Sequence, residues 1–195
     1  MHASSMQHMH DLVSRYLQPN VSLRIVDIGS YDVNGSYRDL FDKPGWRYRG
    51  VDLEAGPNVD VVLSSPYKFP LPSNSADLII SGQAFEHIEF FWLSWSEMVR
   101  VLRPGGLIFL IAPSRGPEHL HPVDCWRFLP AGYRALAKYA GDLDVLEVTT
   151  DWEAHSDQDS ALWGDTVGVF RKSPLRTGLL NRLRRRLASR FIESG

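Results

Sequence analysis

Cysteine is almost absent from this sequence: Cys125 is the only one among 195 residues. An internal disulfide needs two cysteines, so the fold must depend on a buried core, and a chain of this length can form one. Long apolar runs are absent as well. The longest, residues 107–112, is far too short to cross a bilayer, and the first residues lack a signal-peptide pattern. We therefore expect a cytoplasmic protein with one main domain.

Positive charge is scarce everywhere except near the end of the chain. From Arg171 onward there are eight basic residues and one acid, whereas the preceding part has 13 basic and 22 acidic residues. An acidic body argues against nucleic-acid binding. We divide the chain into a domain over residues 1–173 and a basic tail over residues 174–195. Leucines recur at helical spacing in the tail, so we expect an amphipathic helix that packs on the body or on a second copy in a homodimer, in preference to a membrane surface.

The apolar pattern predicts alternating strands and helices. Short apolar or β-branched runs predict strands over residues 23–28, 46–52, 59–63, 77–81, 107–112, 145–149 and 166–170. Apolar residues at helical spacing predict helices over residues 7–17, 36–41, 89–102 and 130–140. This alternation predicts an α/β fold: a doubly wound, mainly parallel seven-stranded sheet with helices on both faces. The last two strands have no clear helix between them and predict an antiparallel hairpin at one edge.

The turn after the first strand has the pattern of a nucleotide-binding site. Residues 24–35 run from a β-branched strand to Asp27, then Gly29, then a polar turn. Taken alone this pattern is short, and the usual later glycines are missing. Three further features in order along the chain support it: Asp52 at the end of the second strand, Glu86-His87 after the fourth, and a Pro-Gly-Gly turn at residues 104–106. Ligands of such sheets lie at the carboxyl ends of the strands, where these residues are expected to meet.

In this order the motifs resemble those of class I S-adenosylmethionine-dependent methyltransferases. The resemblance covers residues 23–110 by motif and the rest by topology. It implies a Rossmann-like fold, S-adenosylmethionine as cofactor, and methyl transfer to an acceptor. Residues 121–128 also resemble a segment of bacterial methyltransferases that act in sugar or natural-product biosynthesis.

The resemblance implies a set of cofactor contacts. Asp52 matches the acid that accepts hydrogen bonds from both ribose hydroxyls, a role that suits a carboxylate because each oxygen can take one O–H. The alternative is that Asp52 only caps its loop. Tyr31 stands where a glycine is usual and is expected to reach toward the substrate, while Ser65 stands near the usual adenine-binding acid. The expected cofactor-binding residues are Asp27, Gly29, Ser30, Tyr31, Asp52, Leu53, Ser65, Ser81, Gly82 and Glu86.

Methyl transfer from a sulfonium is an in-line displacement, so most of the rate enhancement should come from holding the acceptor and the methyl group in line. A hydroxyl acceptor also needs a base, which adds roughly 10²–10⁴-fold. His87 is the first candidate because an imidazole titrates near neutral pH and this one follows the fourth strand. Glu86 would orient His87 or contact the cofactor. The alternative is that both residues only cap the next helix.

A second polar cluster contains His119, His121, Asp124 and Cys125. A His-x-His pair with a nearby aspartate is thin evidence for a metal site, so no metal is expected. We expect this segment to fold over the substrate, with His121 and Asp124 as further catalytic candidates. The expected substrate-binding residues are Tyr31, Arg115, Trp126 and Arg127. A buried brace, with Asp124 paired to Arg127 and Trp126 in the core, fits the sequence equally well.

The function that these features favour is methyl transfer to a small molecule, at a hydroxyl of a sugar or secondary metabolite. A small acceptor is favoured because the chain has no additional domain that could recognise a protein or nucleic acid. The alternative is a weakly active or inactive cofactor-binding module that supports a partner enzyme. The altered positions Tyr31 and Ser65 motivate that alternative.

Overall fold

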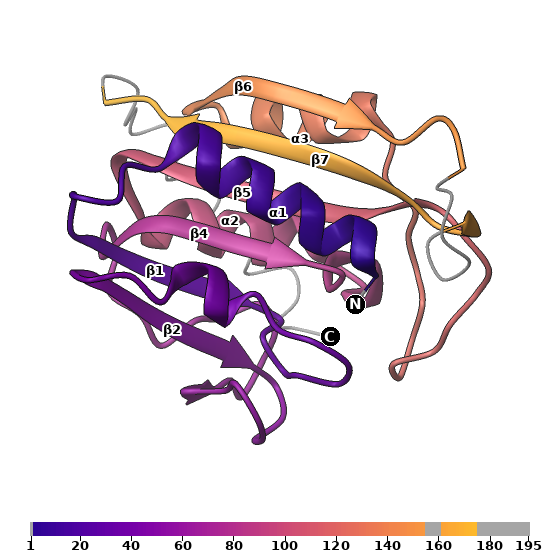
Figure 1. Ribbon diagram of the computed structural model, residues 1–195, viewed down its shortest axis with the longest axis horizontal. Coiled ribbons are helices and arrows are strands. Elements are labelled where there is room, and N and C mark those ends of the chain that lie inside the picture. Colours follow the sequence, from indigo (N-terminus) through magenta and orange to yellow (C-terminus); the bar gives the residue numbers. More distant parts are fainter. Residues whose placement is uncertain (1, 155–160, 175–195) are drawn as a thin grey trace, which may run out of the picture.

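A seven-stranded sheet organises the molecule (Figure 1). The computed structural model describes residues 2–154 and 161–174, and the predicted tail from residue 175 onward lies outside them. The strand order is β3-β2-β1-β4-β5-β7-β6. The strands are β1 (Leu23–Ile28), β2 (Trp46–Asp52), β3 (Val61–Val62), β4 (Ala76–Gly82), β5 (Leu102–Arg115), β6 (Leu143–Thr150) and β7 (Gly164–Lys172).

The first five strands are parallel, and β7 runs antiparallel to both of its neighbours, β5 and β6. The predicted mainly parallel sheet with an antiparallel pair at one edge is therefore confirmed. In Figure 1 the arrowheads of β1, β2 and β4 all point to the same edge of the sheet, where the N-terminus also lies. The strand order reverses between β1 and β4, which is the usual place for a ligand in such sheets.

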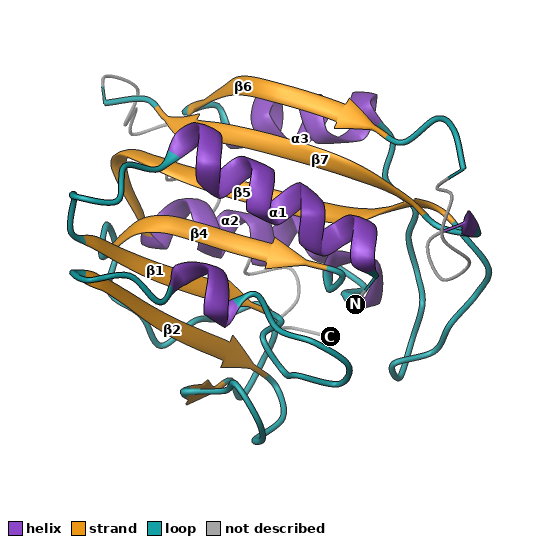
Figure 2. Cartoon of the chain, viewed as in Figure 1, coloured by secondary structure: helices purple, strands orange, loops and turns teal. Residues whose placement is uncertain are grey.

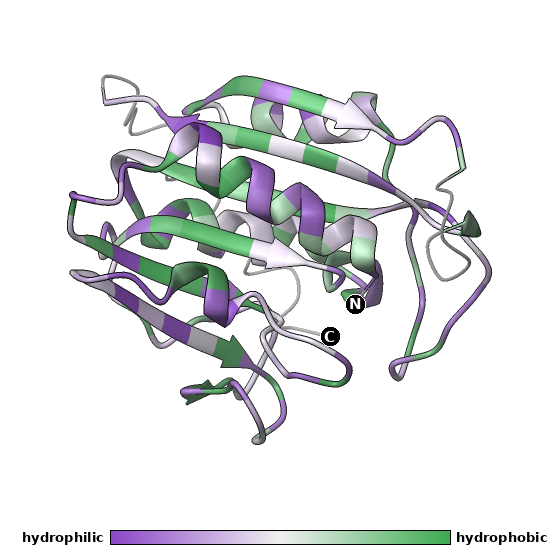
Figure 3. Ribbon diagram, viewed as in Figure 1, coloured by the Kyte–Doolittle hydropathy of each residue, from purple (hydrophilic) through white to green (hydrophobic). Residues whose placement is uncertain are grey.

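Helices cover both faces of the sheet (Figure 2). The α-helices are α1 (Ala3–Tyr16), α2 (Phe91–Val101) and α3 (Pro130–Ala140), and the short 3₁₀ helices are η1 (Arg38–Phe41) and η2 (Phe85–His87). One apolar cluster joins α1 and η1 to the sheet, and a second lies under α2 and α3. Figure 3 shows hydrophobic residues along the central strands, as expected where both faces are covered.

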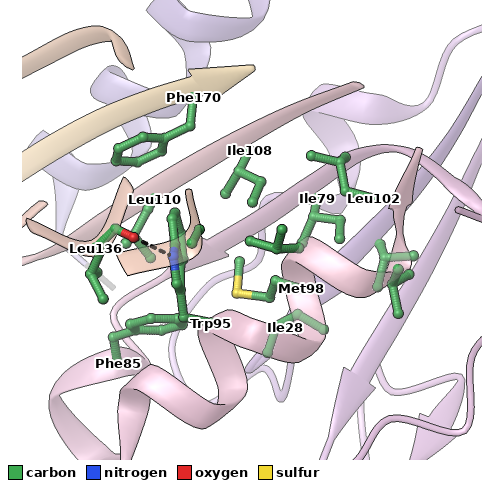
Figure 4. Close-up of a cluster of buried hydrophobic side chains, with 14 of the residues drawn as sticks. Ile28, Ile79, Phe85, Trp95, Met98, Leu102, Ile108, Leu110, Leu136 and Phe170 are labelled. Carbon is green, nitrogen blue, oxygen red and sulfur yellow. Dashed lines mark hydrogen bonds between the residues drawn. The ribbon is translucent and has the colours of Figure 1, made fainter. Parts of the chain in front are cut away.

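The cluster under α2 and α3 is built around Trp95, which is fully buried. Its indole Nε1 donates a hydrogen bond to the Leu136 carbonyl at 3.0 Å, so the one polar atom of the ring is satisfied in the core (Figure 4). Helix α3 begins with Pro130 at its first turn and ends at Gly141, whose φ of 76° favours glycine. This packing fixes the positions of β4 and β5, and thus the positions of the loops that follow them.

Several predicted elements differ in extent. The expected helix over residues 36–41 is only the 3₁₀ helix η1, and the expected third strand is only the two-residue β3. The Pro-Gly-Gly turn lies inside β5, which begins immediately after α2 and shows a register irregularity against β4. Within residues 2–154 and 161–174, none of the helices combines the length and apolar character that a membrane span requires.

Candidate functional site

Asp52, at the end of β2, has a carboxylate that is fixed by backbone amides. Its Oδ2 accepts a hydrogen bond from the Tyr31 N–H at 2.9 Å, and its Oδ1 accepts from Leu53 at 2.7 Å and Glu54 at 3.3 Å. These amides tie the loop after β1 to the loop after β2. A carboxylate oxygen has more than one acceptor direction, so further O–H donors can still be bound. The geometry is compatible with a role in binding a diol, and equally with a loop cap.

The loop after β1 is held close to β4. Gly29 has a φ of 79°, and a Cβ added there would lie 2.3 Å from the Ala84 Cβ, so both backbone conformation and space require glycine. Ser30 Oγ donates to the Asn58 carbonyl at 3.1 Å. The Tyr31 ring lies against Gly56, where an added Cβ would be 2.2 Å from the ring. Tyr31 therefore covers the loop after β2.

Three of the predicted cofactor residues make contacts inside the protein. Asp27 is 3% exposed and accepts a hydrogen bond from the Tyr48 hydroxyl; burial raises the pKa of Asp27 to about 7. Ser81 Oγ donates to the Ile28 carbonyl at 2.8 Å, which joins β4 to β1. Ser65 Oγ accepts from the Tyr67 N–H at 3.2 Å. Of the remaining predicted residues, Leu53 is 48% exposed.

Glu86 follows β4 in the short helix η2, and its side chain is completely buried. Neither carboxylate oxygen has a hydrogen-bond partner among the described residues. Burial raises the pKa of Glu86 to about 8. Its Oε1 lies 3.6 Å from His87 Nε2. A buried carboxyl group without a hydrogen-bond partner is costly, and such groups are found where function requires them.

His87 is held in one orientation. Its Nδ1 lies 2.5 Å from the Val123 carbonyl oxygen, which can only accept a hydrogen bond, so the proton is on Nδ1. In the neutral ring Nε2 then carries the lone pair and faces Glu86. Burial lowers the pKa of His87, although the Val123 carbonyl opposes that effect. His87 is therefore a neutral imidazole with an available Nε2.

The segment after β5 folds over η2. The backbone N–H groups of Cys125 and Trp126 donate to the Glu86 carbonyl at 2.7 and 3.3 Å. The His119 ring centroid lies 4.8 Å and the His121 centroid 5.9 Å from that of His87. The structure thus brings residues from two distant parts of the chain into one polar cluster beside Glu86.

Asp124 and Arg127 form the ion pair that the alternative of a buried brace predicts for this segment. Arg127 donates to both Asp124 oxygens at 2.5 and 2.7 Å, and the Asp124 carboxylate also accepts from the His119 N–H at 2.8 Å. The hydrogen bond from Arg127 holds the pKa of Asp124 well below its usual range. Trp126, by contrast, is 37% exposed rather than part of the core. Asp124 positions its segment, and the ring of the other catalytic candidate, His121, lies 5.9 Å from that of His87 between centroids.

Arg115 holds a loop rather than facing open space. Its guanidinium donates to the carbonyls of Trp152 and Glu153 at 2.8 and 2.6 Å. A separate open groove of about 830 Å³ lies between the start of α1, the loop after β1 and residues 58–60. Asp32, Arg38 and Asp60 contribute to its polar walls, whereas Asp52 and Glu86 do not line it.

Comparison with known proteins shows similarity to methyltransferases. Residues 26–110 match the family described as Methyltransferase domain. An uncharacterised methyltransferase of Mycobacterium avium (strain 104) is 33% identical over 128 residues, which are 60% of this chain and 49% of that protein. Residues 26–110 therefore resemble a methyltransferase domain. The chain spans about half the length of the curated relatives it matches.

Solved structures share the fold of this chain. The Burkholderia thailandensis 1,6-didemethyltoxoflavin-N1-methyltransferase has a TM-score of 0.63 and 16% identity, over 88% of this chain and 77% of that one. The [4+2]-cyclase SpnF also has a TM-score of 0.63, with 15% identity, over 85% of this chain and 80% of that one. At these identities the likeness shows the fold alone, and the fold is used for different reactions.

Sequence reasoning missed the polar contacts between α1 and the candidate site. Gln83, which follows β4 with a φ of 57°, donates to Ser5 Oγ at 3.2 Å and to Asp165 Oδ1 at 2.9 Å. Ser5 Oγ in turn lies 2.6 Å from the Tyr37 hydroxyl. Trp163 packs edge-on against His119 with ring centroids 4.7 Å apart. These contacts join residues far apart in sequence, so no local sequence pattern predicts them.

Proposed function

We propose that this protein transfers a methyl group from S-adenosylmethionine to a small-molecule acceptor, at a hydroxyl group. The observation that supports it most strongly is the fixed carboxylate of Asp52 at the carboxyl end of β2. Its orientation requires no rearrangement before two ribose hydroxyls can donate to it, so little free energy is lost on binding. The matched family supports the same cofactor.

The acceptor would lie toward Glu86, His87 and the segment over residues 119–128. That segment covers the end of β4, and its imidazoles offer polar contacts to a small molecule. A hydroxyl acceptor must lose a proton during transfer, and a neutral His87 with a free Nε2 has the form needed to accept it. The acidic body disfavours nucleic acid as the acceptor.

Calorimetry with S-adenosylhomocysteine tests the cofactor site. We expect Asp52→Ala to weaken binding by about 1.5–3 kcal/mol, the scale of charge-assisted hydrogen bonds. Asp52→Asn keeps one acceptor oxygen and should lose less. Glu54→Ala, at an exposed neighbouring residue, is the matched control and should bind like the wild type.

The absence of any binding to the wild-type protein would contradict this proposal. If the wild type binds the cofactor but transfers no methyl group to a panel of hydroxyl and amine acceptors, the alternative of a supporting, inactive module is favoured. The tyrosine at position 31, which covers the loop after β2, is the feature that motivates this second candidate.

A further inference from the structure

We propose that Glu86, His87 and His119 form a binding site for a divalent transition-metal ion, and we name these three residues the metal cluster. The proposal stands on the geometry of the cluster and does not depend on methyl transfer. It departs from the expectation drawn from sequence, where only His119, His121, Asp124 and Cys125 were considered as ligands. The structure instead pairs one residue of that segment with two residues of η2.

The ligand atoms of the metal cluster lie close together. One carboxylate oxygen and one nitrogen from each of the two imidazoles all lie within 4.8 Å of one another. The Glu86 Oε1–His87 Nε2 distance is 3.6 Å. A zinc ion with bonds of about 2.0–2.2 Å to nitrogen and oxygen requires neighbouring ligand atoms roughly 3.3 Å apart at tetrahedral angles. Small side-chain rotations would therefore complete the site.

Hydrogen bonds around the metal cluster resemble those that orient histidine ligands in metal sites. A metal-binding histidine usually donates its other ring N–H to a carbonyl or carboxylate, which fixes the tautomer and the ring orientation. His87 Nδ1 makes this contact with the Val123 carbonyl, and so leaves Nε2 for the ion. The backbone of His119 is held by its N–H to Asp124 Oδ2. The His87 ring and the backbone of His119 are thus held in place before an ion arrives, and the remaining adjustment is in the side chains.

The burial of the Glu86 carboxyl group supports a bound cation independently of the distances within the metal cluster. Its carboxyl group is fully buried, is directed at His87, and has no hydrogen-bond partner within the described part of the chain. Proteins rarely bury a carboxyl group in this way unless a charge or a ligand compensates it. A divalent cation would compensate it directly.

The donor set selects the class of ion. Two imidazoles and one carboxylate suit Zn²⁺ or Fe²⁺, whereas Mg²⁺ prefers oxygen ligands and keeps its waters. A nitrogen that binds a metal cannot accept a proton, so this site and a role of His87 as base are alternatives. An acceptor hydroxyl bound to such an ion would lose its proton to solvent more readily.

The test is titration of the untagged protein with Zn²⁺ alone, without cofactor, followed by calorimetry and thermal unfolding. We expect binding at the metal cluster and a rise in the melting temperature, with Mg²⁺ producing neither effect at the same concentration. Glu86→Gln and His119→Gln should each weaken zinc binding by at least about 100-fold, because even residues that merely orient a ligand are worth about 10- to 100-fold.

Matched controls separate this site from other histidines. Glu89→Gln and His10→Gln change an exposed glutamate and an exposed histidine and should leave zinc binding unchanged. His8→Gln tests the second group of possible ligands, His8, Asp151 and Asp165. Wild-type protein without a zinc-induced shift, or zinc binding that survives Glu86→Gln and is lost in His8→Gln, would overturn the proposal. Cofactor binding by Asp52 is measured separately, so failure here leaves the proposed methyl transfer standing.

Discussion

Asp27 lies at the end of β1 with its carboxyl group inside the protein, on the same face of the sheet as Ile25 and α1. Burial raises its pKa to about 7, from 3.8, and the Tyr48 hydroxyl only partly opposes this effect. Between roughly pH 4 and pH 7 the folded protein therefore binds more protons at this position than the unfolded chain does. By linkage, that difference lowers the free energy of unfolding as the pH rises through this window.

We therefore expect Asp27→Asn to flatten the pH dependence of stability between roughly pH 4 and pH 7. The amide oxygen can still accept the Tyr48 hydrogen bond, so the variant should fold. Urea unfolding of the cofactor-free protein at several pH values measures the effect. Asp144→Asn, at an exposed position in β6, is the control. A variant that shows the wild-type slope would mean that Asp27 ionises as freely as in the unfolded chain.

At the scale of elements, Asp77 connects three strands at the edge of the sheet opposite the site. Its Oδ2 accepts from the backbone N–H and the Nε of Arg24 in β1, each at 2.8 Å, and its Oδ1 accepts from Arg103 in β5. Burial alone would raise the pKa of Asp77, but the two arginines lower it overall. A lowered pKa stabilises the fold above the ordinary pKa of the acid, and this contribution is lost as the pH falls through the lowered value.

Asp77→Asn should therefore destabilise the protein at pH 7 by about 1–2 kcal/mol, a range kept low because both guanidinium groups are about half exposed. The difference between variant and wild type should shrink as the pH falls below the ordinary range of an aspartate. Thermal unfolding across this range measures it. The control is Asp39→Asn, at an exposed position. A difference that persists unchanged in acid would show that the effect is steric and not electrostatic.

The elements were predictable where a local period exists, and less so where it does not. The apolar strands and their parallel order followed from runs such as residues 107–112, because burial on both faces leaves a continuous pattern. The length of β5 could not be predicted from the sequence. Pro104 and the glycines indicate a turn, whereas pairing with β4 and β7 keeps the chain extended. At the site, Glu86 and His87 could be identified from the sequence as candidate functional residues. Their proximity to His119 could not be predicted, because the loop that brings them together has no periodic sequence pattern.

At the scale of the whole molecule, the last described strand also holds the rest of the domain together. The Lys172 ammonium group is buried and donates to the carbonyls of Val99 at 2.7 Å and Leu102 at 2.6 Å, and to Asn74 Oδ1 at 3.1 Å. These acceptors lie near the end of α2, at the start of β5 and in the connection before β4. Ser173 N–H then donates to the Asp142 carbonyl at 2.9 Å.

Truncation after Ser173 should therefore leave the domain folded and able to bind the cofactor, with stability within about 0.5 kcal/mol of the full chain, because all of these contacts remain. Truncation after Phe170 removes Lys172 and should cost at least about 1.5–3 kcal/mol, the value of hydrogen bonds to a charged group. Thermal unfolding and calorimetry compare the two. If the first truncation fails to fold or to bind, the predicted basic tail belongs to the catalytic domain.

The position of β7 has a consequence during protein synthesis. Among the described strands it is the last to leave the ribosome, yet it belongs between β5 and β6, which are both made earlier. Until residue 172 has emerged, β5 has an open edge and β6 has no neighbour in the sheet, and open strand edges invite pairing with other chains. The nascent chain thus cannot close its sheet from one end to the other as it is made. Its risk of misassembly is greatest just before translation reaches this strand.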